Sequence, residues 1–118
     1  MGSFSFTKQH RLLKRSEFTR LARGANKKEN SLFIGVYKPG LTGENRLGVT
    51  VTKKVGTAAR RNRIKRCVRE VYRKRRPDAP HAYDVNVIAK RHAAKATSSD
   101  LLAAANDLFD RIHGRLNH

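Results

Sequence analysis

The chain has 118 residues and carries 27 Lys and Arg against 9 Asp and Glu, a formal net charge of +18. This length fits one compact domain, residues 1–118, with a modest core, and is too short for two. The excess of cations is larger than solubility requires. It indicates a polyanionic partner, of which nucleic acid is the first candidate.

The positive charge belongs to residues 1–96, because residues 97–118 hold two Arg against three Asp. No apolar run reaches the length of a membrane span, and residues 1–6 lack the pattern of a secretory signal. Phe6 stands where a myristoylation signal has Ser or Thr. We therefore expect a cytoplasmic protein with no membrane partner.

Cys67, the only cysteine, excludes an internal disulfide and is expected to be buried and unreactive.

The first third of the chain predicts little regular structure. Residues 1–15 are basic and expected to be irregular. Ser16 can cap a short helix over residues 17–23 that stops at Gly24. Residues 25–30 are polar and predict a connection without secondary structure.

Two strands are expected next, over residues 32–38 and 46–53. The intervening residues 39–45 contain Pro, Gly and Asn and predict a hairpin loop, so the two strands should pair antiparallel. Apolar and small or polar residues alternate along the second strand, which gives it one apolar face and one polar face.

A long helix should begin after the N-cap Thr57 and end near Arg75, before Pro77. Its apolar stripe lies within roughly 80° of Ile64 on a helical wheel and comprises Ile64, Val68, Val71 and Tyr72. The opposite side is cationic and comprises Asn62, Lys65, Arg66, Arg69 and Arg73, flanked by Arg63. A merely solvated helix face would alternate charge sign, yet Glu70 is the only acid between residues 57 and 76. We therefore expect this side to bind a polyanion.

A third strand over residues 83–89 and a last helix beginning after Ser98 or Ser99 complete the order α-β-β-α-β-α. This order predicts an α+β two-layer sandwich, in which the apolar face of a small sheet packs on the long and C-terminal helices. The polar face would stay open and, with Phe18 at its edge, could form a groove for single-stranded RNA. The alternative is that its Thr and Asn side chains only face solvent.

The sequence offers no convincing catalytic set. The five histidines lie outside the expected core elements and form no pair suited to acid and base chemistry, and the acids are too scattered to hold metal ions. CxxC, HExxH, P-loop and GxGxxG motifs are absent. We therefore expect no catalysis by side chains and no metal bound by the protein alone.

The most specific motif is Arg61-Asn62-Arg63, followed by Lys65-Arg66 and Arg69-Glu70. Before it come Arg46-Leu47-Gly48, Lys53-Lys54 and Gly56. With these elements at this spacing, the chain from about His10 to Leu116 resembles the protein subunit of bacterial ribonuclease P.

The resemblance implies a single RNA-binding domain that assists a catalytic RNA in the endonucleolytic removal of the 5′ leader from precursor tRNA. Mg²⁺ would be held mainly by RNA, and DNA would not be a partner. The resemblance also implies a left-handed strand-helix-strand crossover through the long helix. The residues implied to bind the catalytic RNA are Lys53, Lys54, Arg61, Asn62, Arg63, Lys65, Arg66 and Arg69. The residues implied to line the leader-binding cleft are Lys14, Phe18, Ile34, Val36, Thr50 and Thr52.

The sequence departs from the family pattern at Ala22 and Val36, where relatives commonly have aromatic residues. Stacking of leader bases on aromatic side chains should be reduced accordingly.

Two alternative functions remain open from the sequence. A ribosomal protein often carries a long basic tail, which the slightly acidic C-terminus does not provide. A helix-turn-helix DNA-binding protein needs a helix where residues 46–53 predict a strand.

Overall fold

The computed structural model describes residues 11, 15–23, 25–40, 45–79 and 81–116 of the chain. Four strands form one mixed sheet in the order β1-β2-β4-β3. They are β1 (Asn26–Glu29), β2 (Phe33–Pro39), β3 (Arg46–Thr50) and β4 (Tyr83–Ala89). β2 pairs antiparallel with both β1 and β4, whereas β3 pairs parallel with β4. The predicted α+β class is confirmed.

The predicted hairpin between the strands expected over residues 32–38 and 46–53 is wrong, because β4 lies between β2 and β3. Six of the seven residues of β4 are buried, which suits a central strand. The connection after β2 passes the start of β4, where the Gly40 N–H donates to the Ala82 carbonyl at 3.1 Å. The long helix between β3 and β4 brings the chain back to the end of the sheet where β3 began. β4 therefore runs parallel to β3 and pairs with it. The left hand expected for this crossover stays a prediction.

β1 was also missed and replaces part of the connection expected over residues 25–30. Its sequence, Asn-Lys-Lys-Glu, contains no typical strand former. It pairs through its backbone with β2 at the edge of the sheet. Charged residues on an edge strand discourage pairing with a further chain.

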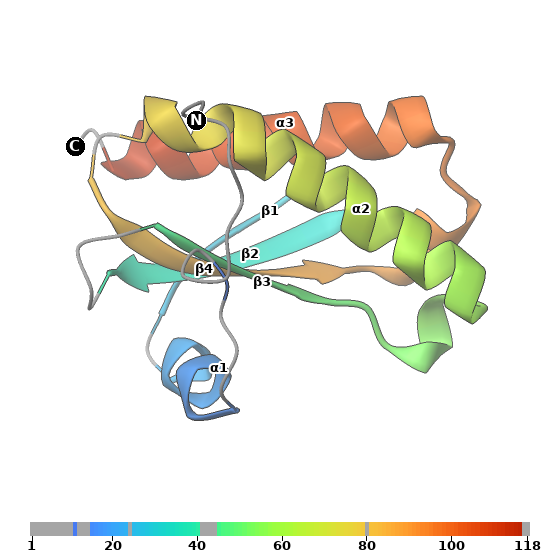
Figure 1. Cartoon of the computed structure of the whole chain (residues 1–118), viewed down its shortest axis with the longest axis horizontal. Helices are drawn as coiled ribbons and strands as arrows, with labels where there is room; N and C mark the ends of the chain where they lie inside the picture. Colours follow the sequence, from blue (N-terminus) through green and yellow to red (C-terminus); the bar gives the residue numbers. More distant parts are fainter. Residues whose placement is uncertain (1–10, 12–14, 24, 41–44, 80, 117–118) are drawn as a thin grey trace.

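Two long helices, α2 (Ala58–Arg75) and α3 (Ser98–Leu116), cover one face of the sheet (Figure 1). The predicted stripe on α2 is buried, and the rings of Tyr72 and Phe109 of α3 lie 5.7 Å apart. α3 approaches β2 closely at Gly35, where an added Cβ would lie 3.0 Å from Ile112 Cδ1. The predicted bounds of α2 are confirmed. The cap of α3 is Thr97 rather than Ser98 or Ser99, since the Thr97 hydroxyl accepts from the Asp100 N–H at 3.0 Å.

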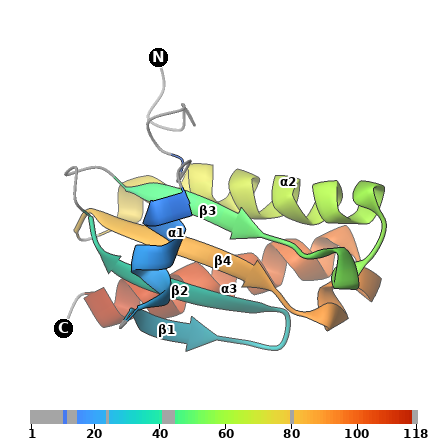
Figure 2. The same ribbon diagram turned by 90° about the horizontal axis from the view of Figure 1, so that it is seen from below.

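The short helix α1 (Arg15–Ala22) lies on the opposite face of the sheet and adds a partial third layer (Figures 1 and 2). It begins earlier than predicted, so Ser16 lies inside the helix rather than at its cap. Leu21 is buried against the sheet. Three 3-10 turns complete the described structure: η2 (Lys53–Val55), η3 (Arg76–Asp78) and η4 (Arg91–Lys95). None of the described helices has the length and apolar character needed to cross a membrane.

Candidate nucleic-acid interface

Local sequence fixes the start and the orientation of α2. Gly56 adopts φ 158°, a backbone conformation that L side chains rarely adopt, and the Thr57 hydroxyl then accepts a hydrogen bond from the Arg60 N–H at 3.3 Å. Ile64 and Val68 are fully buried against the core. Because the apolar stripe is held in the core, the cations on the other sides of α2 are presented by a rigid support.

Most of these cations have no carboxylate partner. Within the described part of the chain, no Asp or Glu lies within ion-pair distance of any of eight basic residues. They are Lys53, Lys54, Arg60, Arg61, Arg63, Lys65, Arg66 and Arg69. Arg73 differs, since its guanidinium contacts Glu70 at 2.6 Å. The expectation of uncompensated charge therefore holds for the first two thirds of α2 and is wrong at Arg73.

Arg61 and Arg63 are oriented by backbone carbonyls rather than by acids. Arg61 Nε donates to the Gly56 carbonyl at 3.2 Å, and Arg63 Nη2 donates to the Ala96 carbonyl at 2.8 Å. A carbonyl positions a guanidinium without cancelling its charge, so both residues stay available to an anion.

The exposed side of α2 is hollowed. A depression of about 530 Å³, the α2 hollow, is lined by Arg11, Asn62, Arg66, Arg69, Glu70 and Arg73. Burial and the neighbouring charge of Arg11 lower the pKa of Arg69. The charged form of Arg69 is therefore disfavoured by burial and by repulsion from Arg11, and a bound anion would stabilise it. Arg11 comes from the N-terminal segment, where it forms an isolated bridge to Leu47 of β3, and sequence reasoning did not place it here.

Three of the predicted cleft residues, Ile34, Val36 and Thr50, lie on one face of the sheet. Ile34 of β2 lies opposite Ile88 of β4, which in turn lies opposite Thr50 of β3. Val36 lies opposite Asn86, and Asn86 opposite Gly48, in the neighbouring row. This face, here called the sheet face, comprises Ile34, Val36, Gly48, Thr50, Asn86 and Ile88 and is turned toward α1. Asn86 and Ile88 were missed, although the alternation along the third predicted strand placed Asn86 on this side.

The polar groups of the sheet face are partly engaged. The Thr50 hydroxyl donates to Asn86 Oδ1 at 3.1 Å, and Asn86 is only 8% exposed. Asn86 is therefore buried rather than facing open solvent. Phe18 is half-buried on α1, and Thr52 is exposed just beyond the end of β3. Lys14 lies outside the described residues.

α1 is tied to the start of the sheet by charged side chains. Glu17 contacts Arg46 of β3, and Arg20 Nη1 contacts Asp84 Oδ2 of β4 at 3.1 Å. Arg20 Nη2 also donates to the Pro39 carbonyl at 2.9 Å. Since Phe18 lies between Glu17 and Arg20 in the sequence, these contacts set where its ring lies relative to the sheet face.

Two predictions about polar side chains need correction. His113 lies inside α3 rather than outside the core elements, and its Nε2 is 2.7 Å from the Tyr83 hydroxyl. Burial, with Arg75 as a second cause, lowers the pKa of His113. Cys67 is half-buried rather than fully buried.

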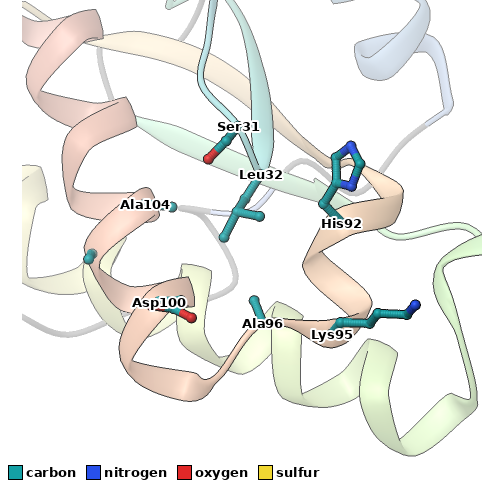
Figure 3. A pocket seen from close by; sticks show the side chains of 8 residues that line it. Ser31, Leu32, His92, Lys95, Ala96, Asp100 and Ala104 are labelled. Atoms are coloured by element: carbon teal, nitrogen blue, oxygen red, sulfur yellow. The ribbon is translucent and has the colours of Figure 1, made fainter.

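A further depression of about 560 Å³ lies between the β1–β2 turn, η4 and α3 (Figure 3). His92, Lys95 and Asp100 line it, but their side chains point in different directions. They therefore do not converge as an acid and base pair would. Among the residues that the structure describes, no group of three or more His, Cys, Asp and Glu could hold a metal ion.

Fold and charge together define a small basic α+β protein with a cationic helix held over a mixed sheet. The model of the ribonuclease P family matches residues 6–113. A ribonuclease P protein component from Desulfatibacillum aliphaticivorans is 46% identical over 118 residues, covering 100% of both chains. The homologous component from Desulforapulum autotrophicum is 41% identical and covers 95% of this chain and 96% of its own length.

Solved structures agree with the sequence relatives. A Staphylococcus aureus ribonuclease P protein mutant superposes with a TM-score of 0.83 at 27% identity over 89% of each chain. The Thermotoga maritima ribonuclease P protein gives a TM-score of 0.76 at 27% identity, over 86% of this chain and 96% of that one. The chain belongs to the ribonuclease P protein family. It is therefore an accessory subunit of a tRNA-processing endoribonuclease, and the ribosomal-protein and helix-turn-helix alternatives are set aside.

Proposed function

We propose that α2 and η2 bind the catalytic RNA of ribonuclease P. The observation that carries this proposal is the set of cations on α2 without carboxylate partners, above all Lys65, Arg66 and Arg69. Cations on a rigid helix contact the phosphates of a folded RNA by shape. The exposed Asn62 adds a group that both donates and accepts hydrogen bonds.

The same proposal assigns the sheet face, with Phe18, to the single-stranded 5′ leader of precursor tRNA. Ile34, Val36 and Ile88 offer apolar surface, while the half-buried Thr50 offers a polar group. One aromatic ring supplies less stacking than several would, so leader binding relies on Phe18 and on charge. Lys14 and Thr52 belong to this leader-binding set.

The catalyst in this proposal is the RNA, with Mg²⁺ held mainly by RNA and substrate. The protein contributes binding and orientation and acts in the cytoplasm, without a DNA or membrane partner. Its own side chains carry no step of the cleavage.

The test compares Arg66→Gln with Arg111→Gln. Both changes remove one positive charge, but Arg111 lies on α3 and pairs with Asp107 at 2.9 Å. The dissociation constant of the partner RNA is measured between 0.1 and 0.5 M salt. Arg66→Gln should lower the log–log salt slope by roughly 0.7 to 0.9, the share of one phosphate contact. Arg111→Gln should leave the slope unchanged.

Cleavage assays complete the test. Precursor tRNA is incubated at low Mg²⁺ with protein alone, partner RNA alone and both together. Cleavage at the mature 5′ end is expected to need the RNA and to be accelerated by the protein. Equal salt slopes for the two variants would refute the assignment of α2, and cleavage by protein alone would refute the assignment of the chemistry.

A further inference from the structure

A second cationic hollow lies where α2 begins. This depression of about 590 Å³, the η4 hollow, is lined by Arg60, Arg63, Ala94, Lys95, Ala96 and Thr97. It forms because the start of α2, η4 and the start of α3 gather at one end of the molecule (Figure 1). Among the residues that the structure describes, three cations and no acid line it.

The η4 hollow is distinct from the α2 hollow. At 100° per residue, Arg60 and Arg63 lie about 120° around the helix axis from the centre of the set Asn62, Arg66, Arg69 and Arg73. The two hollows share no lining residue. A flat partner surface could not contact both hollows at once, whereas an RNA strand that bends around the start of α2 could.

The chemistry of the η4 hollow favours a phosphate over a base. Its apolar part consists of Ala94 and Ala96, which are too small to stack on a nucleobase. Arg63 is held by its bond to the Ala96 carbonyl, so its guanidinium is already oriented. Arg63 Nε is buried and has no hydrogen-bond acceptor among the described residues. Lys95 is exposed, and although Asp100 lines the neighbouring depression with it, no carboxylate of the described residues lies within ion-pair distance of Lys95.

We propose that the η4 hollow binds a backbone phosphate of the partner RNA, separate from the phosphates contacted on the exposed side of α2. This inference rests on the proposed function and extends it to Arg60 and Lys95. Such a contact reads no base and so tolerates any sequence.

The experiment compares Lys95→Gln with Lys27→Gln, using the partner RNA as the probe. Lys27 is exposed on β1 and lies 3.5 Å from Glu29, so the control removes the same charge elsewhere. Lys95→Gln should weaken RNA binding about fivefold at 0.15 M salt and have no effect at 1 M, as expected for one phosphate contact. Lys27→Gln should stay close to the wild type. Equal affinities for the two variants would overturn the inference, while a retained effect of Arg66→Gln would leave the proposed function standing.

Two further measurements separate the remaining outcomes. If the hollows hold different phosphates, the fold losses of Lys95→Gln and Arg66→Gln should multiply in the double variant. A smaller combined loss would mean one shared phosphate and would refute a separate site. If Lys95→Gln instead weakens binding of precursor tRNA in the absence of partner RNA, the hollow serves the leader and the inference is wrong. Circular dichroism of each variant checks that the fold is kept.

Discussion

Arg46 of β3 and Asp84 of β4 are joined by two hydrogen bonds, from Nε to Oδ1 at 3.0 Å and from Nη2 to Oδ2 at 2.8 Å. The Asp84 side chain is fully buried and that of Arg46 is 11% exposed. These hydrogen bonds, together with those to Glu17, raise the pKa of Arg46 above its usual value. Since Glu17 and Arg20 of α1 join the same group, this pair connects the sheet to the helix that carries Phe18.

Replacing Arg46 should destabilise the fold strongly. Arg46→Met removes one partner of a buried pair and leaves the Asp84 carboxylate with Arg20 as its ion-pair partner among the described residues, at a cost of about 3 kcal/mol. Urea unfolding measures the change. Arg111→Met is the control, because its exposed pair with Asp107 should contribute less than about 0.5 kcal/mol. A loss for Arg46→Met no larger than for the control would show that the buried pair does not stabilise the fold.

A methyl group at Gly35 should disturb the contact between β2 and α3. The added Cβ would lie 3.0 Å from Ile112 Cδ1 and 3.3 Å from Leu108 Cδ2, so Gly35→Ala should cost about 1 to 3 kcal/mol by overpacking. The second change Ile112→Val removes the nearest methyl group and should recover part of the loss. Thermal melting compares these variants.

Gly114→Ala serves as the opposite case. Apart from its chain neighbours and the backbone of its own helix, none of the described atoms lies within 4 Å of the position where its Cβ would be, and Gly114 lies inside α3. Its replacement should stabilise the protein by about 0.5 to 1 kcal/mol, since Ala favours a helix. If Gly35→Ala were also stabilising, the close approach of α3 to the sheet would be refuted.

The two long helices and β4 could be predicted because their signals are local. Thr57 followed by the apolar stripe from Ile64 to Tyr72 specifies α2 by capping and periodicity alone. Strand order depends on contacts between distant residues. Nothing local in residues 39–45 distinguishes a hairpin loop from a connection past β4, and β1 exists only because β2 offers it backbone partners.

The candidate site divides in the same way. The cations of α2 could be placed by helical spacing, whereas Ile34, Val36 and Thr50 were named from the family resemblance, and the register of the strands places them on one face. The ion pair of Arg73 with Glu70 depends on rotamers, and the η4 hollow depends on tertiary approach. Nothing in the sequence around Lys95 therefore predicted that it would line the same hollow as Arg63.

Acidification should destabilise the protein through His113. Burial first, and the charge of Arg75 second, lower the pKa of His113 in the folded state, against the opposing effect of Asp78 and Asp110. Well above pH 6.5, the ordinary pKa of histidine, the imidazole is neutral in both states and contributes no pH dependence. Below pH 6.5 the unfolded chain binds the proton first, so stability should fall by up to about 1.4 kcal/mol per pH unit until the folded pKa is reached.

The measurement is urea unfolding between pH 7 and pH 5, a range above the ordinary titration of Asp and Glu side chains in peptides. His113→Gln can keep a hydrogen bond to Tyr83 and does not titrate, so it should lose most of this dependence. His92→Gln is the matched control, because His92 is exposed. Equal pH dependence in wild type and His113→Gln would contradict the argument.

An aromatic residue at Val36 should strengthen leader binding. Val36 is half-buried on β2 and lies opposite Asn86 on the sheet face. A base stacked on an aromatic ring contributes about 1 to 3 kcal/mol, so Val36→Tyr should raise the affinity of the holoenzyme for precursor tRNA by at least about fivefold. The affinity for mature tRNA, which has no leader, should not change. Val36→Ile adds apolar volume without a ring and should have little effect, whereas Phe18→Leu should weaken leader binding. If Val36→Tyr raised the affinity equally for precursor and mature tRNA, the new ring would not contact the leader. The assignment of the sheet face to leader binding would then be refuted.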